Sequence, residues 1–442
     1  MAAETGRIPD FSQKPFLVLW ELTRACALAC AHCRAEAVRQ RHPEELTTQE
    51  GERLLDEIAR FGSPLPLLVL TGGDPLRRPD IYELVEAAAR RGFRVALTPS
   101  GTAAVTRDKL VRLKEAGLSR LAVSLDGSVP EVHDTFRRVK GSYGWTMKII
   151  ESAHALGLPL QINSTVTRQN LSDFPAIASL LEPLGIALWA VFFLVPTGRG
   201  KPEAQVTAWD AERFLNDLYD LSARLPFDVK TTAAPHYRRV VLERQGGFRR
   251  DGRMGSESSP RRRVEGPAPD GILRARDGVN DGKGCVFIDH LGEVYPSGFL
   301  PLSAGNVRQA SLVDLYRNHE IFCQLRDPEL LKHRCGICPY RDFCGGSRAR
   351  AYAVTGDYLA DDPLCFYCPT PRSRATERDR AADAFSSQRQ DDPDAPFEFS
   401  QERVREDTEF TSERFIRNCD QLPDQHVAVP LDSGHSALQP QA

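Results

Sequence analysis

The feature that most constrains the fold is a regular alternation of strand-like and helix-like runs between residues 16 and 223. Six short runs rich in Leu, Val, Ile and Phe are each followed by a longer run with helical spacing of its apolar residues. The expected helices are Thr47–Phe61, Ile81–Arg91, Arg107–Ala116, Tyr143–Leu156, Leu171–Leu184 and Trp209–Ala223. Strands covered on both faces read as nearly continuous apolar runs, so six such units predict an α/β fold with a parallel sheet, either an open doubly wound sheet or a barrel.

Composition divides the rest of the chain. Residues 244–283 are rich in Gly, Pro, Ser and Arg, and they hold too little apolar surface to offset the entropy of ordering. A second ordered region opens with two short strands around a turn and continues through a helix near Leu312–Leu325. The expected organisation is an N-terminal extension (1–15), an α/β domain (16–243), a flexible linker (244–283), a second domain (284–369) and a disordered polar tail (370–442).

Charge and hydropathy exclude several classes of protein. A net charge of −3 over 442 residues lacks the basic surplus of a general nucleic-acid binder. No apolar run reaches the roughly 18 residues that cross a membrane, and the first residues lack the apolar core of a signal peptide. We therefore expect a cytoplasmic protein with neither nucleic acid nor membrane as a partner.

The cysteines are numerous and unevenly placed. Of the eleven, three stand at positions 26, 30 and 33, none lies between 34 and 284, and seven fall between 285 and 368. Disulfides are rare in the reducing cytosol, and an odd number of cysteines at ligand spacing indicates metal binding.

The first three cysteines predict an open iron–sulfur site. Three thiolates are one too few for a closed four-cysteine site, whereas a [4Fe–4S] cluster held by three leaves one iron free for a chelating ligand. The alternative is a packing stripe on one helical face, because buried cysteine behaves as a small apolar residue. Arg24, His32 and Arg34 stand among these cysteines and do not suit such a stripe.

The arrangement Cys26-x3-Cys30-x2-Cys33 after a first strand resembles the radical S-adenosylmethionine superfamily. The turns that end the later strands agree: TGGDP (71–75), TPSGT (98–102), SLDG (124–127), INSTVTRQN (162–170) and FLVPTGRG (193–200). The resemblance covers roughly residues 15–225 and implies a partial (β/α)6 barrel with its site at the carboxyl ends of the strands. It also implies that a [4Fe–4S] cluster on these cysteines binds S-adenosyl-L-methionine and cleaves it to a 5′-deoxyadenosyl radical, which abstracts a substrate hydrogen.

The same resemblance implies roles for particular residues. The glycines of the TGGDP turn would let the backbone approach the methionyl group closely, and the carboxylate of Asp74 would orient its ammonium. Ser124, Asn163 and Arg168 are implied to contact the ribose or the carboxylate. The Leu194–Val195 backbone is implied to contact the adenine. The implied cofactor-binding residues are Gly72, Gly73, Asp74, Pro75, Ser100, Ser124, Asn163, Arg168 and Val195. A one-electron donor such as flavodoxin or ferredoxin is the implied partner.

The second group of cysteines resembles the SPASM or twitch-like auxiliary domain of the superfamily. Arg348 and Ser297 stand where relatives with two auxiliary clusters have cysteines. We therefore expect one auxiliary [4Fe–4S] cluster, on Cys335, Cys338, Cys344 and Cys365, with Cys368 as an alternative fourth ligand. A zinc site made of two C-x2-C pairs is the other interpretation. Cys323, within an apolar helical run, is expected to be a core thiol.

The segments LVLWELTRAC (17–26), TPSGT and CGGSRARAYAVTGDYLADDPLC (344–365) are most similar to the branch that contains the Fe-coproporphyrin decarboxylase of alternative haem synthesis. This implies an oxidoreductase for a net oxidative modification, such as tetrapyrrole propionate decarboxylation in cofactor biosynthesis. Arg199, Arg348 and Arg350 are candidates to anchor propionates or to form structural ion pairs.

Two other functions are considered. A maturase acting on a ribosomal peptide, or on another natural product or small molecule, is the first, although no winged-helix leader-binding domain is expected before Phe16. A non-catalytic metal scaffold is the second, and the TGGDP turn argues against it because a scaffold has no need of a cofactor-binding turn.

Overall fold

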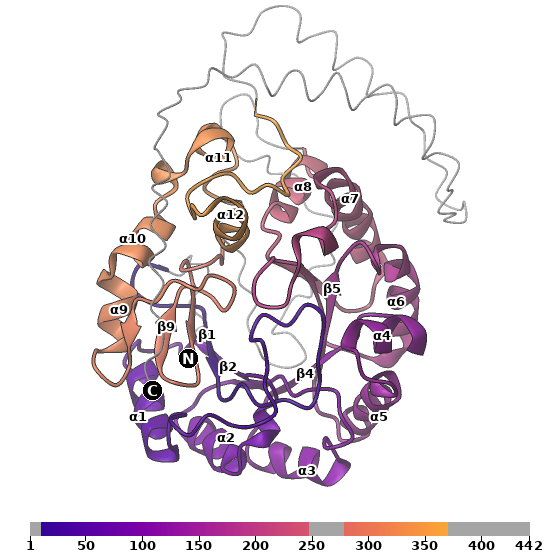
Figure 1. The fold of residues 1–442 in the computed structure, drawn as a ribbon, viewed down its shortest axis with the longest axis vertical. Coiled ribbons are helices and arrows are strands. Elements are labelled where there is room, and N and C mark those ends of the chain that lie inside the picture. Colours follow the sequence, from indigo (N-terminus) through magenta and orange to yellow (C-terminus); the bar gives the residue numbers. More distant parts are fainter. Residues whose placement is uncertain (1–9, 247–277, 370–442) are drawn as a thin grey trace, which may run out of the picture. The chain divides into compact units, whose positions relative to one another are not determined.

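The computed structural model of the chain describes residues 10–246 and 278–369 (Figure 1). All described residues belong to one compact unit. Most of the expected linker (244–283), most of the N-terminal extension (1–15) and the whole expected tail (370–442) lie outside the described residues.

A ten-stranded sheet organises the fold, with the strand order β10-β9-β8-β1-β2-β3-β4-β5-β6-β7. The parallel strands that follow one another are β1 (Leu17–Glu21), β2 (Leu67–Thr71), β3 (Val95–Leu97), β4 (Arg120–Ser124), β5 (Leu160–Val166), β6 (Leu188–Phe193) and β7 (Asp228–Thr232). Because each strand pairs with its immediate successor, the sheet winds in one direction and does not reverse as a doubly wound sheet does. Strands β1 to β6 therefore form the partial barrel that was expected.

The other edge of the sheet comes from the C-terminal part of the described chain. Strand β8 (Cys285–Ile288) pairs in parallel with β1, with Leu17 opposite Cys285. Strands β9 (Glu293–Tyr295) and β10 (Gly305–Asn306) follow in antiparallel pairs. The two short strands expected at the start of region 284–369 are thus present, and they extend the sheet of the preceding region.

The helices that connect the parallel strands lie around the outer side of the sheet (Figure 1). Those expected from the sequence are α1 (Thr48–Ala59), α2 (Ile81–Arg90), α3 (Arg107–Glu115), α5 (Ser142–Ala155), α6 (Phe174–Leu181) and α7 (Ala208–Arg224). The structure adds α4 (Pro130–Arg137), α8 (Tyr237–Arg244), α11 (His333–Ile337) and α12 (Arg348–Thr355). Short 3-10 helices lie at Pro75–Arg77, Leu171–Asp173, Glu182–Leu184, Pro202–Ala204 and Pro328–Leu330.

Local chemistry explains where these helices begin and end. Thr47 caps α1 by accepting the N–H of Glu50, while the Glu50 carboxylate accepts the N–H of Thr47 in return. Gly92 and Gly117 follow α2 and α3 with φ of +87° and +99°, a left-handed conformation that glycine adopts without strain. Both turns bring the chain back to the next strand.

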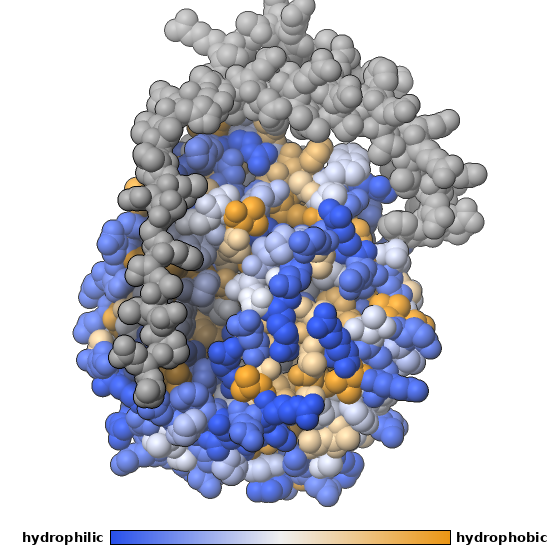
Figure 2. Space-filling model, viewed as in Figure 1, coloured by the Kyte–Doolittle hydropathy of each residue, from blue (hydrophilic) through white to orange (hydrophobic). Residues whose placement is uncertain are grey.

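The core runs without interruption from the parallel strands into β8. Trp20 and Trp189 are fully buried, and so are Val286 and Ile288 of β8. Burying apolar surface contributes about 25 cal/mol per Å², so this shared core is the main force that holds β8 against β1. Figure 2 shows hydrophilic residues with scattered hydrophobic ones between them on the face in view. None of the described helices is long and apolar enough to cross a membrane.

Two expectations for the C-terminal region were wrong. The single helix near Leu312–Leu325 is two helices, α9 (Leu312–Asn318) and α10 (Glu320–Arg326), because His319 between them is extended, with ψ of 135°. Cys323 is exposed rather than in the core. Helix α10 buries Ile321, Phe322 and Leu325 instead.

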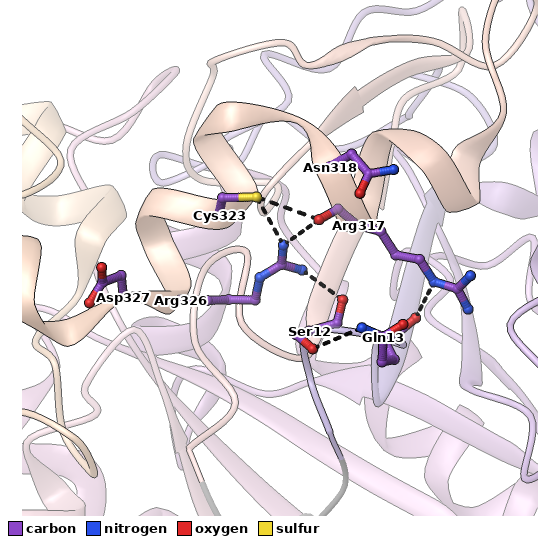
Figure 3. Close-up of a pocket in the computed structure, with 7 residues that line it drawn as sticks. All are labelled: Ser12, Gln13, Arg317, Asn318, Cys323, Arg326 and Asp327. Carbon is purple, nitrogen blue, oxygen red and sulfur yellow. Dashed lines mark hydrogen bonds between the residues drawn. The ribbon is translucent and has the colours of Figure 1, made fainter.

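The Cys323 thiol lies at a cavity of about 380 Å³ beside the N-terminal segment (Figure 3). Its sulfur is 3.5 Å from the carbonyl oxygen of Arg317 and 3.5 Å from Nη2 of Arg326. The Arg326 guanidinium also donates to the carbonyl of Tyr316 and to those of Phe11 and Ser12. These bonds fasten the N-terminal segment to α9 and α10, which is a structural role.

Candidate active site

A cavity of about 200 Å³ lies at the carboxyl ends of the parallel strands, where active sites of α/β barrels lie. The sequence-predicted residues that line it are Cys26, Cys30, Cys33, Gly72, Gly73, Ser100, Ser124, Asn163 and Val195. They come from six different strands or from the turns that follow them, so the sheet brings together residues far apart in the sequence.

The three cysteines belong to the loop that follows β1. This loop folds back on itself, because Cys26 donates its N–H to the carbonyl of Val38 at 2.7 Å. Cys26 and Cys30 are buried, and Cys33 is half-buried. Leu28 packs beside them. The loop therefore holds its sulfurs toward the interior and toward the cavity.

The turn after β2 packs against this loop. Gly73 donates its N–H to the carbonyl of Thr23 at 2.7 Å. A Cβ at Gly73 would lie 2.5 Å from the carbonyl oxygen of Arg24, and one at Gly72 would lie 2.4 Å from that of Thr23. Contact with the chain's own backbone is thus sufficient to require both glycines.

Ser100 joins this turn to the first cysteine. Its hydroxyl donates to the carbonyl of Gly73 at 2.8 Å and lies 3.0 Å from the sulfur of Cys26. Asp74 is buried, and its carboxylate accepts the N–H groups of Leu76 at 3.2 Å and Ser100 at 3.4 Å. Burial raises the pKa of this carboxyl. Asp74 and Pro75 do not line the cavity and instead shape the turn that does.

Arg168 is not brought to the cavity. It is exposed, and its Nε donates to the carbonyl of Gln205 at 2.7 Å. Its backbone N–H donates to the carbonyl of Ala204 at 3.0 Å. The side chain fastens the loop after β5 to the segment before α7.

The three arginines considered as propionate anchors differ sharply. Arg199 lines the cavity, and it donates from Nε to the carbonyl of Cys30 at 3.0 Å and from Nη1 to that of Ala37 at 3.1 Å. Its Nη2 is buried and has no hydrogen-bond partner among the described residues. A buried N–H without an acceptor is costly, so this group is available to an anionic ligand.

Arg348 and Arg350 cannot serve as anchors at this cavity. Both are fully buried, and neither lines it. Arg348 donates to the carbonyls of Tyr358 and Ala360, and Arg350 pairs with the buried Asp362 at 3.2 Å. The sequence left two roles open for these arginines, propionate anchor or structural ion pair. Arg350 has the second role.

A buried charged pair that sequence reasoning missed stands beside Cys30. Arg137, at the end of α4, has its Nη1 at 3.6 Å from the sulfur of Cys30, and its Nη2 donates to Asp126. Asp126 is fully buried and accepts the N–H of Thr165 at 2.7 Å. Burial alone would lower the pKa of Arg137, but Asp126 and Cys30 raise it overall, so the guanidinium is charged. The spacing of His133 and Arg137 after SLDG, at i and i+4 of a helix, is the pattern that could have indicated it.

His32 is a second residue that the sequence reasoning did not use. Burial, together with the charge of Arg137, lowers its pKa to about 3, so the ring is neutral near pH 7. The ring lies 4.4 Å from that of Phe136, lines the cavity, and has no partner for Nδ1 among the described residues. The charged groups next to Cys30 are therefore Arg137 and Arg199.

In the second set of cysteines, Cys335 lies in α11, and Cys338, Cys344 and Cys365 lie in the loops after α11 and α12; none of them lines the cavity. Burial raises the pKa of Cys344 to about 12, with contributions from the neighbouring Cys335 and Cys338. Burial also raises the pKa of Cys365, with a contribution from Cys344. The four thiols are thus close enough to influence one another, and a cation would favour their deprotonation.

In residues 10–246 and 278–369, no three Cys, His, Asp or Glu side chains converge closely enough to hold one metal ion. Four ligands around one zinc ion would converge in that way. In a [4Fe–4S] cluster each thiolate binds a different iron, so the sulfurs are spread further apart.

Comparisons with known proteins agree with the site. Residues 20–181 match the radical SAM superfamily. The chain is 40% identical to the AdoMet-dependent heme synthase of Methanosarcina barkeri over 355 residues, which are 80% of this chain and 97% of that protein. It is 31% identical to the pre-heme d1 synthase of Dinoroseobacter shibae, over 85% and 91% of the two chains. Streptococcus suis SuiB bound to S-adenosylmethionine has the same fold, with a TM-score of 0.61, 15% identity, and coverage of 80% and 78%.

The chain belongs to the radical SAM superfamily, and it is an enzyme. This confirms the resemblance first seen in the cysteine spacing and the strand-end turns, including its similarity to the haem branch. Enzymes of this superfamily use a [4Fe–4S] cluster together with S-adenosylmethionine.

Proposed function

We propose that this enzyme acts on a propionate side chain of a tetrapyrrole, in the cytoplasm, and brings about an oxidative decarboxylation in cofactor biosynthesis. The names of its relatives support a tetrapyrrole substrate. The observation that carries the proposal is the cavity lined by both the three-cysteine loop and Arg199, whose buried Nη2 lacks an acceptor. A carboxylate is the group that such a guanidinium binds best.

In this proposal Cys26, Cys30 and Cys33 hold the [4Fe–4S] cluster, and an electron comes from a flavodoxin or ferredoxin. Contacts to S-adenosylmethionine are assigned to the other cavity residues expected from the sequence, which are Gly72, Gly73, Ser100, Ser124, Asn163 and Val195. Asp74 and Pro75 would act by shaping the turn, and Arg168 has no place in the cavity. When bound, this pair of cofactors supplies the radical that removes a hydrogen atom from the substrate.

The chain's own side chains would orient the substrate and exclude water from it. Phe192, Leu194 and Phe299 line the cavity and would exclude water from a reactive substrate. Arg199 would hold a propionate through a charge-assisted hydrogen bond, and its two carbonyl contacts fix the direction of the guanidinium. Orientation of this kind is what the protein contributes when a cofactor supplies the chemistry.

The second cysteine set completes the electron balance. After removal of a hydrogen atom from a propionate carbon, loss of CO2 and of one electron leaves a vinyl group. That electron needs an acceptor. We assign this role to one auxiliary [4Fe–4S] cluster on Cys335, Cys338, Cys344 and Cys365.

The test uses anaerobically reconstituted enzyme with dithionite, S-adenosylmethionine and Fe-coproporphyrin III, and mass spectrometry of the porphyrin products. Arg199→Met should lower kcat/KM for the porphyrin roughly 10- to 100-fold, the value of one hydrogen bond to a charged group. Lys201→Met, two residues away and exposed, is the matched control and should have no effect. A porphyrin left unmodified by the unaltered enzyme, while a peptide or another small molecule is modified, would contradict the proposal.

A further inference from the structure

We propose that the buried Arg137–Asp126 pair tunes the reduction potential of the iron–sulfur cluster, through a hydrogen bond from Arg137 to the sulfur of Cys30. The inference rests on the proposed placement of that cluster on Cys26, Cys30 and Cys33. It concerns how readily the cluster accepts an electron, and not what the enzyme acts on.

The guanidinium of Arg137 contacts two partners. One terminal nitrogen, Nη2, donates to Asp126, and the other, Nη1, lies 3.6 Å from the sulfur of Cys30. The side chain is largely buried, with 11% of its surface exposed, and that of Asp126 is fully buried. A charged N–H donor thus faces a ligand sulfur from inside the protein, where screening by salt is weak.

Several contacts hold this donor in place. Asp126 accepts the N–H of Thr165 at 2.7 Å, so its carboxylate has a fixed direction. The amide of Asn170 donates to the carbonyls of both Asp126 and Thr165, at 3.0 and 2.9 Å. The loop of Cys30 is attached to the end of α4 as well, because Ala31 donates its N–H to the carbonyl of Phe136 at 3.2 Å.

Other groups around Cys30 do not duplicate this contact. Arg199 donates to the carbonyl of Cys30 at 3.0 Å rather than to its sulfur. The Cys26 sulfur instead faces the uncharged hydroxyl of Ser100 at 3.0 Å. Among the described residues, Arg137 is therefore the cation that contacts the sulfur of Cys30.

The expected direction of the effect follows from charge. One-electron reduction adds negative charge to a cluster and to its thiolate ligands, so a nearby cation and an N–H···S bond stabilise the reduced form more than the oxidised form. Hydrogen bonds to the sulfurs and local charge are among the factors that set cluster potentials. Arg137 should accordingly raise the potential and make the electron easier to deliver.

The experiment is a redox titration of the full-length, reconstituted enzyme without S-adenosylmethionine, followed by electron paramagnetic resonance. The signal of the first cluster is identified in a parallel sample as the one that changes when S-adenosylmethionine is added. The variant Asp126→Asn/Arg137→Gln removes both charges, so no unpaired charge remains buried. Arg138→Gln removes a positive charge from the next residue, which is exposed, and serves as the control.

The double variant should lower the equilibrium constant for reduction at least tenfold, which is about 59 mV for a one-electron couple. Arg138→Gln should leave the potential unchanged, and Arg137→Lys, which keeps the charge but not the forked donor, should give an intermediate shift. An unchanged potential in both Arg137 variants, with weaker binding of S-adenosylmethionine, would show that Arg137 serves only as a ligand-binding group. If the unaltered enzyme shows no signal that responds to S-adenosylmethionine, the cluster assignment itself fails.

Discussion

The two cysteine regions present the same donor atom in different surroundings. The loop of Cys26, Cys30 and Cys33 follows a central strand and faces a cavity, and backbone contacts with the turn after β2 support it. The second set lies in α11 and in the loops after α11 and α12, outside that cavity. Side chains hold it in place: Cys335 donates its N–H to Asp361 at 2.8 Å, and Ser347 donates its N–H to Asp362 at 2.8 Å. An open site suits a cofactor that must admit a ligand, whereas a site enclosed by its own loops suits one that only transfers electrons.

In each of the two cysteine regions, an arginine lies beside one of the sulfurs, but the two arginines have different hydrogen-bond partners. Arg137 faces the sulfur of Cys30 at 3.6 Å, and Arg348 faces that of Cys335 at 3.8 Å. Arg348, however, donates its other hydrogen bonds to carbonyls of its own loop, including that of Ala360 at 2.7 Å. These hydrogen bonds show that Arg348 supports its own loop.

The largest expected effect is the loss of all radical chemistry. Replacing Cys26, Cys30 and Cys33 together by Ala should remove about four iron atoms per chain, since each cluster holds four. Cleavage of S-adenosylmethionine to 5′-deoxyadenosine should then stop, while iron at the second region remains. Iron analysis and chromatography of the nucleoside products measure both, and undiminished cleavage would falsify the assignment of the first region.

The next effect separates cleavage from product formation. Replacing Cys335 and Cys338 by Ala should also remove about four iron atoms. Because the cavity is untouched, cleavage of S-adenosylmethionine should continue without coupling to a porphyrin product. Metal analysis gives a clear opposite outcome: one zinc per chain that disappears with these substitutions would make the second region structural.

Sequence patterns predicted the first region far better than the second. The six strands were apolar enough to be recognised, and their order brought the turns together at one edge. Strand β7 was missed because it is half-exposed at the sheet edge and its residues, DVKTT, are mostly polar. Helix α4 was missed because two of its three buried residues are His133 and Arg137, and a pattern of apolar spacing does not register buried charge.

The arginines and Cys323 show the same limit of sequence patterns, which do not reveal tertiary contacts. The sequence shows that Arg350 is cationic, but not that Asp362, twelve positions later, is folded against it inside the protein. Cys323 lies in an apolar run, yet α10 turns its neighbours inward and leaves the thiol exposed. Which face of a short helix is buried depends on tertiary contacts, and these leave little trace in seven residues.

A third prediction concerns the stability of the second region. Arg350→Met should destabilise the protein by about 3–5 kcal/mol, because it leaves Asp362 charged and unpaired in the interior. Arg350 also donates to the carbonyl of Ala233 at 2.7 Å, so part of this loss reflects the contact with the segment after β7. Adding Asp362→Asn should recover part of the loss in urea unfolding. Equal stability of the single variant and the unaltered protein would show that the pair is not needed.

The smallest effect is a dependence on pH that involves His236. Burial lowers the pKa of this residue to about 4, so between pH 6.5 and 4 the unfolded chain binds a proton that the folded chain excludes. Stability should therefore fall as the pH is lowered, by about 2 kcal/mol from pH 7 to pH 5 through this residue. His236→Gln should reduce that slope in urea titrations at the two pH values. An unchanged slope would mean that His236 is protonated in the folded state, beside Asp362 at 3.7 Å.

The pairing of β8 with β1 has a consequence for how the chain is made. Strand β1 leaves the ribosome early, but the partner for its outer edge is not synthesised until Cys285–Ile288. At translation rates of roughly 5–20 residues per second, that edge waits on the order of tens of seconds. During this interval an apolar strand with unpaired backbone groups is open to association with other nascent chains. Faster synthesis of residues 22–284 should therefore raise the soluble yield of the enzyme.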